Sequence, residues 1–143
     1  MIVLDTNVIS ELMRDAPRSS ILAWLNDQAS ASLFVTTITE AEVHLGIALL
    51  PTGKRRDGIA EAAGRVFGVF FHGRILPFDS EAAHAYAVIA AKRRADGRPI
   101  SQFDCQIASI ARCRGAALAT RNTRDFEGSG IDLIDPWGQS ANR

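Results

Sequence analysis

Short apolar runs alternate with longer amphipathic stretches along this chain. Residues 2–4 form a continuous apolar run, Ile-Val-Leu, that ends at the polar residues Asp5, Thr6 and Asn7. Such a run is typical of a short strand buried on both faces of a sheet. Apolar positions that recur every three or four residues predict helices between the strands. The predicted strands are 2–4, 33–35, 75–76, 116–119 and 131–134, and the predicted helices are 6–13, 21–28, 38–50, 54–71, 81–96 and 103–114.

The order of these elements predicts an α/β fold. Strands alternate with helices, and no two strands are joined by a two-residue hairpin signal. This order favours a parallel sheet with helices on both faces. The 143 residues are enough for a single domain with one sizeable core. We expect this domain to cover residues 1–135, followed by a polar C-terminal tail at 136–143.

The first strand ends directly at a carboxylate, Asp5. Open α/β sheets bind ligands at the carboxyl ends of their strands, so Asp5 is a candidate functional residue. The structural alternative is that Asp5 only caps the following helix, since Asp is a favoured N-cap.

A second acid falls within the apolar pattern of the predicted helix 38–50. Thr37 and Glu40 have the spacing of a capping box, which gives Glu40 a structural role. Glu42 has no such role, and a carboxylate on a buried face is costly unless it is paired or ligates a metal. A buried ion pair is therefore the alternative for Glu42. The apolar stripe that surrounds it consists of Ile38, Ala41, Leu45, Ala48 and Leu49.

Two further acids occupy comparable places. Asp104 borders the apolar face of the predicted helix 103–114, although Ser101 could cap that helix with Asp104 in its first turn. Asp125 follows the predicted strand 116–119, where Asn122 could cap a short turn. Thr120 and Asn122 are additional oxygen donors in the same segment.

Four acids in one cleft would repel one another by kilocalories per pair unless a cation lay between them. Oxygen ligands select hard ions, so Mg²⁺, or else Mn²⁺, is the expected metal. Such a site suits phosphodiester hydrolysis, because the metal polarises the phosphate and activates a water molecule.

Composition sets the remaining limits. The 16 acidic and 16 basic residues give a net charge of zero, so total charge does not indicate nucleic-acid binding. Withdrawal of four acids into a metal site would leave a net basic surface. The two cysteines, Cys105 and Cys113, are too far apart along one helix to form a disulfide and are interpreted as reduced thiols. No long apolar segment or signal peptide is recognisable, which favours a cytoplasmic protein without membrane contact.

Four segments together resemble the PIN-domain toxins of the VapC and FitB type, the toxin half of bacterial toxin–antitoxin pairs. The resemblance covers nearly the whole chain. It implies a compact α/β/α sandwich with a mostly parallel sheet and Mg²⁺-dependent ribonuclease activity. It also implies a homodimer, inhibition by a small cognate antitoxin of the VapB or FitA kind that binds DNA, and a higher-order complex with that antitoxin. The four segments are 4–10 (LDTNVIS), 41–46 (AEVHLG), 103–108 (FDCQIA) and 119–126 (ATRNTRDF).

The resemblance also implies roles for individual residues. Asp5, Glu42 and Asp104 match the acidic triad that holds the metal. Some relatives carry an aspartate at the place of Asn122, and others use an acid at the place of Asp125, so Asp125 is assigned a weaker catalytic role. Thr6 and Thr120 are expected to position water or phosphate, with Asn122 as a further supporting residue.

Three arginines are candidates for contact with RNA phosphates: Arg121, Arg124 and Arg98. They lie in the loops that carry Asp125 or precede Asp104. The clusters 54–56 and 92–94 are interpreted as solvated helix faces. Trp24 and Trp137 have no second aromatic residue nearby in the sequence with which to stack a base.

Two other functions remain open. A phosphatase could use Asp5 as its nucleophile, but the second acid that such chemistry usually needs two residues later is replaced by Asn7. A catalytically weak module could act only with its antitoxin in transcriptional autoregulation, although such a module would have no use for the four acids.

Overall fold

A computed structural model of the chain describes residues 1–138. All five strands of its single sheet run parallel, in the order β3-β2-β1-β4-β5. The prediction of an α/β fold with a parallel sheet is therefore confirmed. The strands are β1 (Ile2–Leu4), β2 (Leu33–Thr36), β3 (Ile75–Leu76), β4 (Ala117–Ala119) and β5 (Leu133–Ile134). The α-helices are α1 (Thr6–Leu12), α2 (Ser19–Asn26), α3 (Thr37–Ala48), α4 (Lys54–Arg65), α5 (Ser80–Ala95) and α6 (Gln102–Cys113). There are also two short 3₁₀ helices, η1 (Ser30–Ser32) and η3 (Thr123–Phe126), and a π-helix, η2 (Val66–Phe70), that continues α4.

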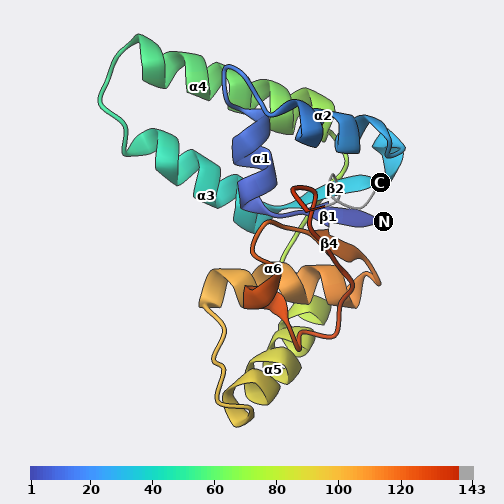
Figure 1. The fold of residues 1–143 in the computed structure, drawn as a ribbon. Coiled ribbons are helices and arrows are strands. Elements are labelled where there is room, and N and C mark those ends of the chain that lie inside the picture. Colours follow the sequence, from blue (N-terminus) through green and yellow to red (C-terminus); the bar gives the residue numbers. More distant parts are fainter. Residues whose placement is uncertain (139–143) are drawn as a thin grey trace.

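The sheet lies between two helical layers, as Figure 1 shows. Successive side chains of a strand point to opposite faces, so β1 contributes to both layers. Val3 packs in the core beneath α5 and α6, whereas Leu4 packs in the core beneath α1, α2 and α4. Both side chains are fully buried, which explains the continuous apolar run at the start of the chain. The two layers complete the expected α/β/α sandwich.

The strand order reverses beside β1, and this reversal positions the site. From β1 the chain moves outward through β2 and β3, then returns to place β4 on the other side of β1. Leu4 pairs with Ala119, and the Asp5 backbone N–H donates to the Ala119 carbonyl at 2.9 Å. The segments that follow β1 and β4 therefore leave the sheet side by side, at the kind of crevice where open α/β sheets bind ligands.

The start and the buried face of α3 differ from prediction. The N-cap is Thr36, not Thr37, and the Thr36 hydroxyl accepts from the Thr39 N–H at 3.1 Å. The predicted apolar stripe is largely exposed, with Leu45 56% and Leu49 76% accessible. Val43 and Ile47 pack against the core instead. The reason is that α3 runs out past the sheet and packs against α1 and α4, so helical neighbours select its buried face (Figure 1).

The chain does not leave the core at β5. Pro136 is buried, and Trp137 packs against the core that contains Leu4 and Ala119. The predicted domain limit at residue 135 stays a prediction, and most of the predicted tail lies outside the described residues. Cys105 and Cys113 are free thiols, as expected. Within residues 1–138, no helix combines the length and the apolar character that crossing a membrane requires.

Candidate metal and nuclease site

Asp5 is both a helix cap and the centre of a polar site. Its side chain is only 5% exposed. One carboxylate oxygen, Oδ1, accepts from the Thr6 N–H at 2.8 Å and so caps α1. The other, Oδ2, accepts from the Thr120 hydroxyl at 2.7 Å and from the Asn7 amide at 3.4 Å. The structural and the functional interpretation of Asp5 are thus compatible, because the two oxygens have different partners.

Glu42 is held toward Asp5 by a threonine. The Thr6 hydroxyl donates to Glu42 Oε1 at 2.9 Å. The Thr6 hydroxyl has a single proton, which is used in this bond. The Thr6 oxygen therefore accepts from the Thr39 hydroxyl, 3.0 Å away. A short chain of hydroxyls therefore connects the buried start of α3 to the Glu42 carboxylate. The predicted supporting role of Thr6 has a clear geometric basis in this chain.

Asp104 reaches the same site from the other helical layer. It lies in the first turn of α6, whose N-cap Ser101 accepts from the Asp104 N–H at 3.3 Å. Asp5, Glu42 and Asp104 all line one cavity of about 520 Å³. The fold thus brings together three acids that are up to 99 positions apart in the sequence.

Burial and mutual repulsion disfavour the charged form of all three acids. Burial raises the pKa of Asp5 to about 6, with the charges of Asp104 and Glu42 adding to the effect and the Thr120 and Thr6 hydrogen bonds opposing it. Burial raises the pKa of Glu42, and Asp104 raises it further against the Thr6 bond. Burial also raises the pKa of Asp104, assisted by Asp125 and opposed by Ser101 and Arg93. The site is therefore electrostatically strained at neutral pH.

Among residues 1–138, no arginine or lysine relieves this strain by direct pairing. Within the described part of the chain, none of the three acids forms a salt bridge. Nor do any three Asp, Glu, His or Cys side chains among residues 1–138 converge closely enough to hold a metal alone. Mg²⁺ usually binds one or two carboxylates and keeps several waters. Carboxylates that line a cavity with room for an ion and its waters fit such a site, and the buried-pair alternative for Glu42 is not observed among the described residues.

The two candidates for the fourth acidic position lie differently. Asn122 lines the cavity, and its backbone N–H donates to the Thr120 hydroxyl at 3.1 Å. Asp125 is exposed and lies outside the residues that line the cavity. Its charge nevertheless raises the pKa of Asp104, so it acts on the site from its edge. This placement fits the weaker role assigned to Asp125.

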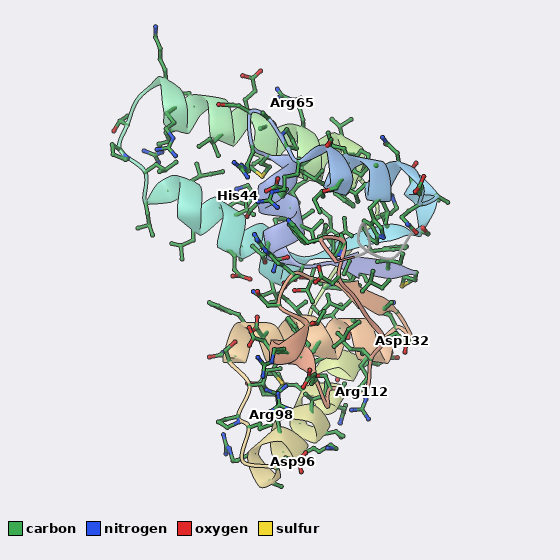
Figure 2. All side chains as sticks on the ribbon, in the orientation of Figure 1. His44, Arg65, Asp96, Arg98, Arg112 and Asp132 are labelled. Atoms are coloured by element: carbon green, nitrogen blue, oxygen red, sulfur yellow. The ribbon has the colours of Figure 1, made fainter. Side chains whose placement is uncertain are left out.

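Of the three candidate RNA-binding arginines, only Arg121 lines the cavity. Its backbone N–H donates to Asn7 Oδ1 at 3.3 Å. Arg98 instead lies in the layer of α5 and α6 (Figure 2), where it bonds Glu127 Oε2 at 3.3 Å and the Arg124 carbonyl at 3.2 Å. Arg124 is exposed. The geometry thus favours Arg121 over Arg98 as a contact for a phosphate beside the acids.

Several residues that line the cavity were not predicted from the sequence. Asn7, Ser10 and Glu11 lie on α1 and Arg14 lies just after it, and their helical spacing makes a polar stripe that could have indicated the site. Glu11 is buried, and the hydrogen bond from the Arg18 N–H lowers its pKa. The remaining missed residue is Trp137, which no local pattern links to the acids.

The elevated pKa of Asp5 predicts how the metal-free protein responds to pH. An acid whose pKa rises on folding, here from 3.8 to about 6, binds its proton more tightly in the folded state. The contribution of Asp5 to the free energy of unfolding is therefore highest below pH 4. It falls by about 3 kcal/mol in total as the pH rises through 6. Urea unfolding in EDTA from pH 4 to 7 measures this loss by comparison with Asp5→Asn, which lacks the titrating group.

The exposed Asp132, on the loop before β5 (Figure 2), gives the matched control, Asp132→Asn. Its unfolding free energy should follow that of the wild type across the range. Parallel curves for the wild type and Asp5→Asn would contradict the prediction.

Fold and site together define an α/β protein with a carboxylate-lined cavity where the strand order of a parallel sheet reverses. The PIN domain model matches residues 2–128, so the chain belongs to the PIN-domain family. It is 44% identical over 96% of its length to the plasmid stability protein StbB of Pseudomonas syringae pv. tomato, covering 99% of that protein. It is 42% identical to the VapC ribonuclease Y4jK of Sinorhizobium fredii, over 98% of that protein, and 38% identical to the toxin FitB of Neisseria gonorrhoeae, over 99% of that protein. Each of these two matches covers 96% of this chain.

The fold has a close counterpart among solved structures. A chain in the structure of FitAB bound to an IR36 DNA fragment superposes with a TM-score of 0.89 at 38% identity, over 96% of each chain. The predicted resemblance to PIN-domain toxins of the VapC and FitB type is confirmed.

Proposed function

We propose that this protein is a Mg²⁺-dependent endoribonuclease and the toxin of a bacterial toxin–antitoxin pair. The observation that carries the proposal is that Asp5, Glu42 and Asp104 line one cavity, and that none of them has a cationic partner among the described residues. Membership of the PIN family supports it. So do relatives that are named as a VapC ribonuclease and as a toxin.

In this proposal Asp5, Glu42 and Asp104 hold Mg²⁺, or Mn²⁺ in its place. When bound, the ion supplies the positive charge that polarises the scissile phosphate and favours deprotonation of the attacking water. The Thr6 and Thr120 hydroxyls fix the orientations of the Glu42 and Asp5 carboxylates through their hydrogen bonds. The Arg121 guanidinium offers the RNA phosphate a charged donor at the cavity wall.

We further propose that the chain binds a small, DNA-binding antitoxin and forms a homodimer. The FitAB complex with DNA is the precedent for the antitoxin. Exposed apolar side chains on α2 and η2 are candidates for these contacts, with Leu22 38%, Phe70 48% and Val69 76% accessible. Location in the cytoplasm is part of the same proposal.

Cleavage of total bacterial RNA tests the proposal directly. Purified protein freed from any partner should produce discrete fragments with Mg²⁺ or Mn²⁺ and none in EDTA, and excess Mg²⁺ should restore cleavage. The reason is that the carboxylates alone cannot neutralise the charge that develops on the phosphate. Folded protein that leaves RNA intact in every metal would favour the partner-binding module, whereas turnover of a small phosphoester alone would favour the phosphatase.

A further inference from the structure

We propose that Trp137 and Arg121 form a stacking subsite for one nucleobase of the RNA, at the wall of the acidic cavity. The inference rests on the proposed ribonuclease function and adds to it a contact with the base. Both residues line the cavity that Asp5, Glu42 and Asp104 also line. The Arg121 guanidinium lies over the Trp137 indole, with its Cζ atom 5.4 Å from the ring centroid.

The fold places this pair through two neighbouring strands. Arg121 follows the end of β4, and Trp137 follows the end of β5, which pairs with β4. The Thr120 N–H donates to the Ile134 carbonyl at 2.9 Å, so the two segments stay paired beyond the strands. A local turn then directs the chain, because Asp135 Oδ1 accepts from the Trp137 N–H at 2.9 Å. The indole is thus carried to the cavity by hydrogen-bonded backbone.

Hydrogen bonding does not explain the position of the indole. Its Nε1 atom is buried and has no hydrogen-bond partner among the described residues. Buried tryptophans usually place this N–H on an acceptor, and an unused donor costs free energy. The ring packs against the apolar core and beneath the Arg121 guanidinium. Because both residues line the cavity, the indole and the guanidinium together present one π-surface at its wall.

A nucleobase is the ligand that fits these surfaces. Bases stack on aromatic rings and on guanidinium planes, and stacking tolerates any sequence because every base has a π-face. The adjacent acids would hold the metal, which in turn would contact the scissile phosphate, so a base stacked here belongs to a nucleotide next to the cleaved bond. Trp137 has no second aromatic residue nearby in the sequence, but in the folded protein the Arg121 guanidinium lies over its ring and provides the second stacking surface.

Trp24 provides an internal comparison. It is 6% exposed, packs in the same core cluster as Leu4, and is absent from the cavity wall. A Trp24→Phe protein therefore retains one tryptophan, at the proposed subsite. Its fluorescence reports directly on stacking, whether or not the enzyme turns over.

The test is a fluorescence titration of Trp24→Phe in EDTA with a short single-stranded RNA and with an abasic oligonucleotide of equal charge. We expect the RNA to quench Trp137 strongly and the abasic chain to quench it little. A Trp137→Phe protein, which reports Trp24 alone, should show no quenching and serves if Trp24→Phe folds poorly. Equal responses to the two oligonucleotides, or binding of labelled RNA without quenching, would overturn the subsite.

Cleavage kinetics with Mg²⁺ separate this inference from the proposed function. Trp137→Leu should raise KM roughly 10- to 100-fold with little change in kcat, since base stacking is lost while the acids are unchanged, and Trp137→Phe should recover most of the affinity. Unchanged KM in a folded Trp137→Leu protein that cleaves RNA overturns the subsite and leaves the ribonuclease intact. A wild-type protein that neither binds nor cleaves RNA overturns both.

Discussion

Replacing Asp5 with asparagine should lower the rate of Mg²⁺-dependent RNA cleavage by at least about 100-fold, because the metal would lose a charged ligand that contributes several kcal/mol. Asparagine has nearly the same size and still offers an oxygen to the Thr6 N–H, so the cap of α1 is preserved. The protein should therefore remain folded. The rates at which the wild type and Asp5→Asn cleave a defined RNA are compared under single-turnover conditions, with enzyme in excess over RNA.

Matched variants show whether the loss is specific to the cavity. Asp104→Asn should resemble Asp5→Asn, since both side chains line the cavity. Asp125→Asn should cost less, because Asp125 is exposed and acts at the edge of the site. Asp132→Asn should cleave like the wild type, which shows that loss of a surface acid is not enough to stop cleavage. Loss of cleavage in Asp5→Asn and Asp104→Asn, purified in the same way, excludes a contaminating nuclease. Retention of wild-type rates by Asp5→Asn would remove the basis of the metal site.

The sequence was sufficient to predict the fold because its strands are marked by continuous apolar runs. Runs such as 2–4 are interpretable without tertiary information, since a strand buried on both faces must be apolar throughout. The same reasoning located Asp5, which directly follows such a run. Helix faces were harder to predict. The buried side of α3 depends on α4, which packs against it, and no local pattern states that Leu45 and Leu49 face outward.

The candidate site was predictable in part for a similar reason. Asp5 and Asp104 could be identified from a strand end and a helix start. Glu42 was singled out by an apolar stripe that proves largely exposed, although the residue does line the cavity. Trp137 could not be identified, since its place in the cavity depends on how β5 pairs with β4. The position of Trp137 in the cavity wall could be known only from the topology of the sheet, whereas the acids could be proposed from the local sequence around each of them.

Arg93 shows that a charge cluster can hide a structural residue. The sequence 92–94 was interpreted as a solvated face, and for Arg93 this is wrong: the side chain is 5% exposed. The sequence did indicate that Arg93 faces the core, because Arg93 follows Ala82, Tyr86 and Ile89 at helical spacing. Those three residues lie on the face of α5 that packs against the core. Its guanidinium donates from Nε to the Arg98 carbonyl at 2.7 Å, and from Nη1 to the Asp125 and Glu127 carbonyls at 2.9 and 2.7 Å.

Replacing Arg93 with methionine should therefore destabilise the protein by about 3–5 kcal/mol, because three carbonyls lose a charged, buried donor at once. The carbonyls belong to the loop before α6 and to the segment around η3, so the variant also loosens the connection between Asp104 and Asp125. Urea unfolding followed by circular dichroism measures the loss. Arg94→Met removes the exposed neighbouring charge and should change stability by less than about 0.5 kcal/mol.

Arg93→Lys distinguishes geometry from charge. Lysine keeps the positive charge but is a compact donor that cannot reproduce the planar fork of the guanidinium. We expect an intermediate loss of stability, closer to the methionine variant, because the three bonded carbonyls lie on two separate segments of the chain. Equal stability of the lysine variant and the wild type would mean that charge alone holds the η3 segment. Equal stability of Arg93→Met and Arg94→Met would mean that hydrogen bonds to water satisfy these carbonyls as well as Arg93 does.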